Sequence, residues 1–131
     1  MKFVLDGSRI EFEIPDKWLA EAGVYQYQRI TDAYTAEPEE EYRSCPMVLL
    51  AIADIAPPVR QSGIESFKRD RMIKVLRGLV AGDVIPAIAV HEPRLPSQYH
   101  YAVRDGFHRF YASAALGFSK ITASVVPFFE L

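Results

Sequence analysis

Apolar and polar residues alternate at the start of the chain, a pattern that predicts a β-hairpin followed by a short helix. The turn-forming residues Asp6-Gly7-Ser8 separate two alternating runs. The apolar members of these runs are Phe3, Leu5, Ile10, Phe12 and Ile14. Asp16 is expected to cap the helix that follows, and Gly23 is expected to end it.

The next part of the chain combines aromatic residues, an acidic run and an apolar stretch. The residues between 24 and 34 that are spaced for packing are Tyr25, Tyr27, Ile30 and Tyr34. Residues 36–43 form an acidic loop, which we expect to be solvated surface. The apolar stretch Met47–Ile55 predicts a buried strand that Pro57-Pro58 ends.

Helical spacing dominates residues 65–81, where apolar residues recur at steps of three and four and predict an amphipathic helix closed by Gly82. The apolar residues in this spacing are Phe67, Met72, Val75, Leu76 and Leu79. The other predicted elements are strands over 84–90, 99–103 and 121–126, and a helix over 105–116 that Gly117 stops. Strands and helices mix without strict alternation, so the predicted fold class is α+β with a mixed sheet.

The length and composition favour one globular domain. The chain has 131 residues, of which 50% are hydrophobic and 24% charged. We predict a single domain over 1–131, with an N-terminal hairpin and helix extension over 1–45 and a core over 46–131. Cys45 stands alone and cannot form an internal disulfide. No secretory signal and no run of about 18 apolar residues is found, so we expect a cytoplasmic protein without membrane contact.

Charge is distributed unevenly along the chain. The formal net charge is −2, yet the acidic residues concentrate in 1–45 and the basic residues in 46–131. Duplex DNA is bound mainly by neutralising phosphates with Lys and Arg. A sequence pI near 5.9 therefore argues against DNA as a partner, while a local basic patch can still hold a nucleotide.

Residues Asp105-Gly106-Phe107-His108-Arg109 carry the chemistry that points to function. A strand runs into a turn at Asp105-Gly106, and a helix begins at once. The first helical turn leaves backbone N–H groups unpaired, and the helix dipole adds positive potential there. Gly106 allows close approach of a ligand to the backbone, and Arg109 offers two parallel hydrogen bonds to a phosphate. These are the components of an anion-binding site.

An architectural explanation of the same residues stays open. Asp105 then only caps the helix, Gly106 only makes the turn, and Arg109 pairs with a surface carboxylate. Against it, cationic residues at a helix start oppose the dipole and therefore require a negative partner. The three histidines, His91, His100 and His108, match no compact metal-ligand spacing, so we expect no metal held by protein ligands alone.

Several short patterns occur in a fixed order between Ile52 and Val126. Ile-x-Pro-Pro-x-Arg covers 55–60, Gly-x-x-Ile-Pro-x-Ile-x-Val covers 82–90, and Asp-Gly-x-His-Arg covers 105–109. A helix with small residues and Leu116-Gly117 follows, and then a closing strand. This order resembles the ParB/sulfiredoxin fold family, whose members are also labelled ParB-like nuclease domains. Residues 1–45 lie outside the resemblance.

The resemblance implies that Gly106, His108 and Arg109 hold nucleotide phosphates, with Arg60 as a further contact. Sulfiredoxins place a catalytic cysteine between the Gly and the His, whereas this chain has Phe107, which argues against sulfinic acid reduction. Partition ParB proteins carry an acidic residue and a second Arg in this turn, so a partition clamp is not expected. The resemblance is to stand-alone members, such as free serine kinases, which add a catalytic carboxylate.

Our leading hypothesis is a nucleotide-binding domain that transfers a phosphoryl group or hydrolyses a nucleotide, ATP or CTP with Mg²⁺, at the 105–109 turn. In this hypothesis Asp105 and His108 are the catalytic residues, and Asp105 sets the turn or helps hold Mg²⁺. A second hypothesis is a non-catalytic module that senses a nucleotide or contacts a protein partner through acidic residues 37–43. A third, based mainly on the family label, is DNA binding or nuclease activity.

Overall fold

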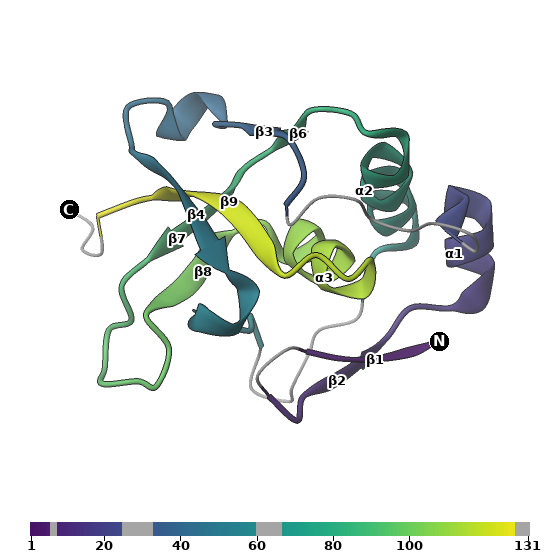
Figure 1. Ribbon diagram of the computed structural model, residues 1–131, viewed down its shortest axis with the longest axis horizontal. Helices are drawn as coiled ribbons and strands as arrows, with labels where there is room; N and C mark the ends of the chain where they lie inside the picture. The colour runs from purple at the N-terminus through teal and green to yellow at the C-terminus, as the bar shows by residue number, and fades with distance from the viewer. Residues whose placement is uncertain (6–7, 25–32, 60–66, 128–131) are drawn as a thin grey trace.

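The computed structural model describes residues 1–5, 8–24, 33–59 and 67–127 (Figure 1). Within these residues the main sheet has five strands in the order β4-β9-β7-β8-β5. Their bounds are Met47–Ala51 for β4, Ile55–Ala56 for β5, Ile88–His91 for β7, Tyr101–Asp105 for β8 and Lys120–Val125 for β9. The pairs β4–β9 and β7–β8 are antiparallel, whereas β7–β9 and β5–β8 are parallel. The sheet is mixed, which confirms the predicted α+β class.

Helices α2 (Arg69–Ala81) and α3 (Phe107–Ala115) complete the core with this sheet. In Figure 1, α3 lies behind the sheet and α2 lies beside α3. The central strand β7 is buried throughout Ile88–Val90, and Ile88 is paired with Ala123 of β9. Ile88, Val90 and Ala123 form one buried cluster with Met72 and Leu76 of α2 and Phe110 of α3. Each such large side chain stabilises the fold by about 1.5–3 kcal/mol relative to exposure.

The N-terminal hairpin and helix form as predicted. Strands β1 (Lys2–Val4) and β2 (Glu11–Glu13) pair antiparallel, and the opposed rings of Phe3 and Phe12 stack with centroids 5.3 Å apart. Helix α1 (Asp16–Ala22) follows and ends at Gly23. The expected cap at Asp16 is wrong: Pro15 holds the cap position, and Asp16 begins the helix. Its carboxylate instead lies 2.8 Å from the N-terminal amine.

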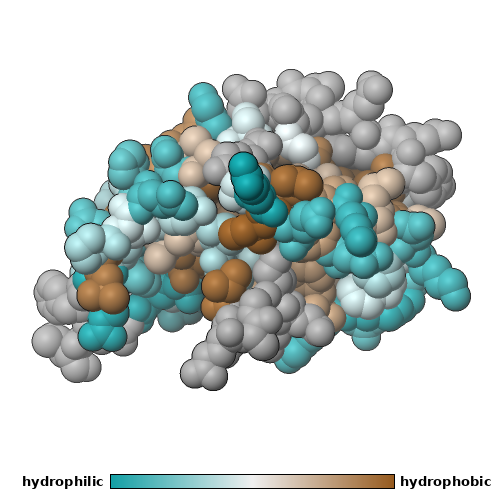
Figure 2. Space-filling model, turned by 90° about the horizontal axis from the view of Figure 1, so that it is seen from below, coloured by the Kyte–Doolittle hydropathy of each residue, from teal (hydrophilic) through white to brown (hydrophobic). Residues whose placement is uncertain are grey.

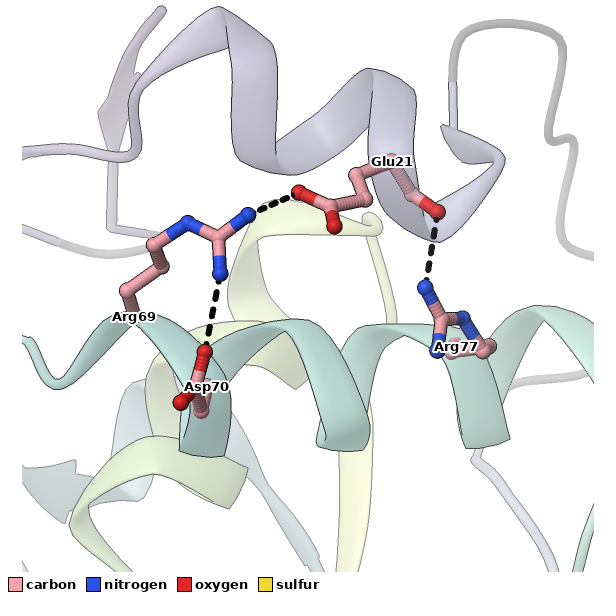
Figure 3. A network of polar contacts seen from close by, with 4 residues as sticks. All are labelled: Glu21, Arg69, Asp70 and Arg77. Atoms are coloured by element: carbon pink, nitrogen blue, oxygen red, sulfur yellow. Dashed lines mark hydrogen bonds and ion pairs between the residues drawn. The ribbon is translucent and has the colours of Figure 1, made fainter.

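Helix α1 docks on α2 through buried apolar residues and a polar network at the rim (Figure 3). Arg69 pairs with the carboxylate of Glu21 and donates to Asp70 at 2.8 Å. Arg77 donates to the backbone carbonyl of Glu21 at 3.1 Å. Exposed ion pairs of this kind contribute about 0–1 kcal/mol each, so the network orients the helix more than it stabilises it.

The acidic segment 36–43 is partly integrated into the fold, which corrects the expectation of a solvated loop. Strand β3 (Ala36–Glu37) pairs in parallel with β6 (Ile85–Pro86), and the 3-10 helix η2 (Glu40–Tyr42) follows. The Tyr42 side chain is buried. The sequence alone does not reveal that Tyr42 is buried, because four acidic side chains dominate the segment.

The apolar stretch 47–55 is not one buried strand, and this prediction is also wrong. It forms β4, a 3-10 turn η3 (Ile52–Asp54) and β5. Because β4 is an edge strand of the sheet, Met47, Val48 and Leu49 are 39–52% exposed, and Leu50 is the first fully packed position. An apolar run predicts burial on both faces only when the strand is central.

The remaining elements differ from prediction mainly at their ends. Within the described residues α2 begins at Arg69, with Phe67 and Lys68 outside the helix, and it ends at Gly82 as expected. The predicted strand 84–90 is divided into β6 and β7. Asp105 ends β8, and α3 begins two residues later at Phe107. Tyr25, Tyr27 and Ile30 lie outside the described residues.

Within the described ranges no helix is long and apolar enough to cross a bilayer. On the face seen from below the view of Figure 1, hydrophobic residues lie in small groups between hydrophilic ones (Figure 2). Such scattered exposure is ordinary for a protein surface and does not mark a large apolar interface.

Candidate functional site

The turn between β8 and α3 is built around Gly106, which caps the helix with φ +116°. A Cβ atom on this residue would lie 2.5 Å from Cγ2 and 2.9 Å from Cβ of Ile88 on β7. Both the positive φ and the contact with Ile88 therefore require glycine. The sequence explains Gly106 by the close approach of a ligand. The structure shows that Gly106 also allows the turn to pack against Ile88.

The first turn of α3 lines a pocket of about 980 Å³ between α2, β6 and the end of β8. Its apolar lining includes Val59, Val84 and Val103. Its Lys and Arg residues are Arg71, Lys74, Arg77, Arg104 and Arg109, and its acidic residues are Asp83 and Asp105. Basic side chains thus outnumber acidic ones in the lining around the α3 N-terminus, where the helix dipole also favours an anion.

Arg109 is held by groups of the protein itself. Its Nη1 donates to the backbone carbonyls of Pro86 at 2.9 Å and Ala87 at 3.0 Å. Its Nη2 lies 2.5 Å from a carboxylate oxygen of Glu39 and 3.9 Å from one of Asp105. The side chain is only 12% exposed. Arg109 therefore joins the break between β6 and β7, the acidic segment and the start of α3.

His108 is buried beside the rings of Phe67 and Phe107. Its Nε2 accepts a hydrogen bond of 2.9 Å from the backbone N–H of Lys68, the residue that caps α2. A backbone N–H can only donate, so Nε2 carries a lone pair and no proton in this arrangement. His108 thereby connects the two helices that border the pocket.

Three carboxylates gather beside Arg109. Glu39, Glu41 and Asp105 each bring one oxygen within 4.8 Å of the other two. Carboxylate oxygens are ligands that Mg²⁺ prefers, and one Arg neutralises only part of three negative charges. The donor types and the residual charge therefore fit a Mg²⁺ ion that arrives with a phosphate ligand, and Asp105 is the member of the group that lines the pocket.

Two buried tyrosines surround the same region. Burial raises the pKa of Tyr34 from 10.0 to about 12, although the charge of Arg109 opposes the shift. Burial also raises the pKa of Tyr111, whose hydroxyl donates to the carbonyl of Pro58 at 2.9 Å. Both hydroxyls are therefore neutral near neutral pH and supply no general base.

The structure brings together Asp105, Gly106, His108 and Arg109, whereas Arg60 lies outside the described residues. Ser113 is buried and donates to the carbonyl of Arg109 at 2.7 Å, in agreement with the packing role that its mid-helix position suggests. Cys45 is half-buried and is not part of the pocket lining.

Sequence reasoning missed two contributions to the site. Glu39 was assigned to a solvated loop, and nothing in the local pattern identifies it as the partner of a residue 70 positions away. The sequence identifies Arg71 and Lys74 only as polar positions of an amphipathic helix. Their i, i+3 spacing places them on one side of α2, but only the packing of α2 beside α3 reveals that this side borders the pocket.

Comparison with known proteins agrees with this architecture. A solved structure of sulfiredoxin from Arabidopsis thaliana is similar with a TM-score of 0.51 and 19% sequence identity, over 63% of this chain and 86% of that chain. The chain has a sulfiredoxin-like fold. No protein-family model matches the sequence, and a search of curated proteins finds no match.

At this level of identity the likeness establishes the arrangement of the chain and not its chemistry. The sulfiredoxin-like fold confirms the family resemblance as far as fold is concerned, while the likeness to stand-alone members stays a prediction. Within the fold, the residue between Gly106 and His108 is Phe107, whose ring packs against those of Phe67 and Tyr111.

Proposed function

We propose that this protein binds the phosphate groups of a nucleotide in the pocket between α2 and the start of α3. One observation carries the proposal: the first turn of α3 and the basic side chains of α2 line the same 980 Å³ pocket. The backbone groups and helix dipole favour an anion, and the volume is sufficient for a small-molecule ligand.

The cations of the pocket belong to three elements, α2, β8 and α3, and the last of these carries Arg109. Arg71 and Lys74 are exposed on α2, and Arg104 is exposed at the end of β8. Phosphates lying between them would reach the α3 N-terminus, while the apolar side chains of Val84 and Val103 would contact the base or sugar. Mg²⁺ would accompany a triphosphate and bring its charge next to Asp105.

Phosphoryl transfer or nucleotide hydrolysis is the finer form of this proposal. Such reactions depend on positioning and charge neutralisation, so a sparse site is sufficient. Asp105 has a partly exposed carboxylate in the pocket and is the candidate to orient an attacking hydroxyl or water. His108 is a weaker candidate, because its Nε2 already accepts the Lys68 N–H.

A non-catalytic nucleotide sensor is the second candidate. It is favoured by the engagement of both His108 and Arg109 with backbone groups of the protein, which leaves few side chains to take part in a reaction. Contact with a protein partner through residues 37–43 would use the exposed acids of this segment, since Tyr42 and Glu39 face the fold.

Calorimetric titration with ATP, CTP, ADP, GTP and pyrophosphate, with and without Mg²⁺, tests the proposal. Lys74→Ala is compared with Lys120→Ala, which removes the same charge from an exposed lysine outside the pocket lining. Binding that weakens in Lys74→Ala and not in Lys120→Ala supports the site. Absence of binding by every compound refutes it, and phosphate release by the bound protein separates the enzyme from the sensor.

A further inference from the structure

The contact between Glu39 and Arg109 suggests how the pocket is regulated. We propose that the Glu39 carboxylate occupies the position on Arg109 that a phosphate of the ligand takes, so that the acidic segment competes with the ligand for the site. This inference rests on the proposed function. It adds that a carboxylate of the protein itself competes with the ligand for Arg109.

The geometry of Arg109 directs Nη2 to an anion. Nη1 is used by the carbonyls of Pro86 and Ala87, which fix the plane of the guanidinium. Nη2 lies 2.5 Å from a carboxylate oxygen of Glu39. Carboxylate and phosphate oxygens accept hydrogen bonds from guanidinium in the same way, so one anion can replace the other without moving the arginine.

The Glu39 side chain can move while the backbone of the acidic segment stays attached to the fold. Strand β3 pairs with β6 over only two residues, Ala36 with Ile85 and Glu37 with Pro86. The backbone N–H of Ala87 donates to the carbonyl of Glu37 at 2.7 Å, two residues before Glu39, so this hydrogen bond can persist when the Glu39 side chain moves. The Glu39 side chain is 25% exposed, so its carboxylate can leave Arg109 without opening the buried core.

Charge makes the competition effective. A phosphate approaching Arg109 meets the carboxylates of Glu39, Glu41 and Asp105, which lie within 4.8 Å of one another. Removal of the Glu39 charge would both release Nη2 and reduce repulsion of the ligand. Removal of the Glu41 charge would reduce the repulsion alone, because among the described residues the carboxylates paired with Arg109 are those of Glu39 and Asp105.

The test is calorimetric titration of Mg-pyrophosphate and Mg-ATP into the wild-type protein, Glu39→Gln and Glu41→Gln. Loss of a hydrogen-bonded charge pair is expected to tighten binding about tenfold in Glu39→Gln, and the charge effect in Glu41→Gln is expected to be about threefold or less. Glu39→Asp keeps the charge but shortens the side chain, and is expected to tighten binding as well. Circular dichroism confirms that each variant is folded.

Each outcome has a separate meaning. Equal affinities of Glu39→Gln and Glu41→Gln, or weaker binding by Glu39→Gln, overturn the competition while the proposed function stands. Absence of binding by the wild-type protein and by every variant overturns both. If Glu39→Gln does not fold, unchanged affinity of Glu39→Asp relative to wild type overturns the competition.

Discussion

The backbone N–H of Lys68 donates a 2.9 Å hydrogen bond to Nε2 of His108, across the junction between α2 and α3. The two residues are 40 positions apart, and α2 has no side-chain cap of its own. The imidazole therefore satisfies a donor at the start of one helix from the first turn of another. This hydrogen bond gives His108 a structural role that does not depend on a ligand.

Replacement of His108 by Ala is expected to destabilise the protein. The substitution leaves the Lys68 N–H without its acceptor and removes a ring packed against Phe67 and Phe107. A partly buried donor that is left without its acceptor lowers the unfolding free energy by about 1–3 kcal/mol. Urea unfolding monitored by circular dichroism measures the change. An unfolding free energy within 0.5 kcal/mol of wild type, about the scatter for neutral surface changes, would contradict this role.

Gly106→Ala is expected to be among the most destabilising small substitutions in the chain. The added Cβ would meet Ile88 at 2.5 Å, and the residue would have to hold φ +116°. Strain and overpacking each cost about 1–3 kcal/mol. Gly82→Ala is the matched control, because φ is +76° there and the new Cβ would meet no atom within 4 Å beyond its own neighbours in the chain.

Thermal unfolding of both variants distinguishes the two costs. Gly82→Ala carries only the backbone strain, so its melting temperature should fall clearly less than that of Gly106→Ala. Equal losses would mean that the contact with Ile88 relaxes without cost, and the tight approach of β7 to the turn would then have no structural importance.

The two tyrosines predict how stability depends on alkaline pH. The pKa of Tyr34 is about 12 in the folded protein against 10.0 for a solvated tyrosine, so the unfolded chain loses its proton first as pH rises. The stability that the neutral hydroxyl contributes is complete below pH 10.0 and is lost progressively up to about pH 12. One pH unit above 10.0, the loss from Tyr34 is about 1 kcal/mol.

Comparison of Tyr34→Phe with the wild-type protein isolates this effect, and Tyr111→Phe shows the cost of losing a hydrogen-bonded hydroxyl. Among the described residues the Tyr34 hydroxyl is buried without a hydrogen-bond partner, so its removal should leave stability at neutral pH unchanged or raised. Removal of the Tyr111 hydroxyl breaks the bond to the Pro58 carbonyl and should cost about 0.5–1.5 kcal/mol. Denaturant unfolding across the alkaline range should show a shallower decline for Tyr34→Phe than for wild type.

The sequence predicts those parts of the fold that depend on local periodicity. Helices α2 and α3, the N-terminal hairpin and the turn at Gly106 all follow from residue spacing and turn chemistry. The stretch from Met47 was misjudged because an apolar run does not reveal whether its strand is central or at an edge. The acidic segment was misjudged because β3 is defined by pairing with β6, about 50 residues away.

The candidate site was located from sequence, but its contacts were not. The chemistry of Gly106, His108 and Arg109 is visible in the sequence, whereas the groups that they meet are not. Ile88, Lys68 and Glu39 approach the turn from three different elements, and their identity depends on tertiary packing. Glycine, histidine and arginine at such a turn can therefore stabilise the fold and bind a ligand at the same time.

Arg109→Lys separates these two roles of the arginine. A lysine retains the charge but cannot bond two carbonyls and a carboxylate in one plane, so the contacts to Pro86, Ala87 and Glu39 would be incomplete. We expect a loss of about 1–3 kcal/mol in unfolding free energy, because carbonyls that were bonded to a charged donor are left unpaired. Amide hydrogen exchange should increase at β3 and at the start of α3, which the side chain joins. If stability and exchange are unchanged while Mg-ATP binding is lost, Arg109 serves the ligand alone. If both change together, the loss of binding follows from the disrupted turn.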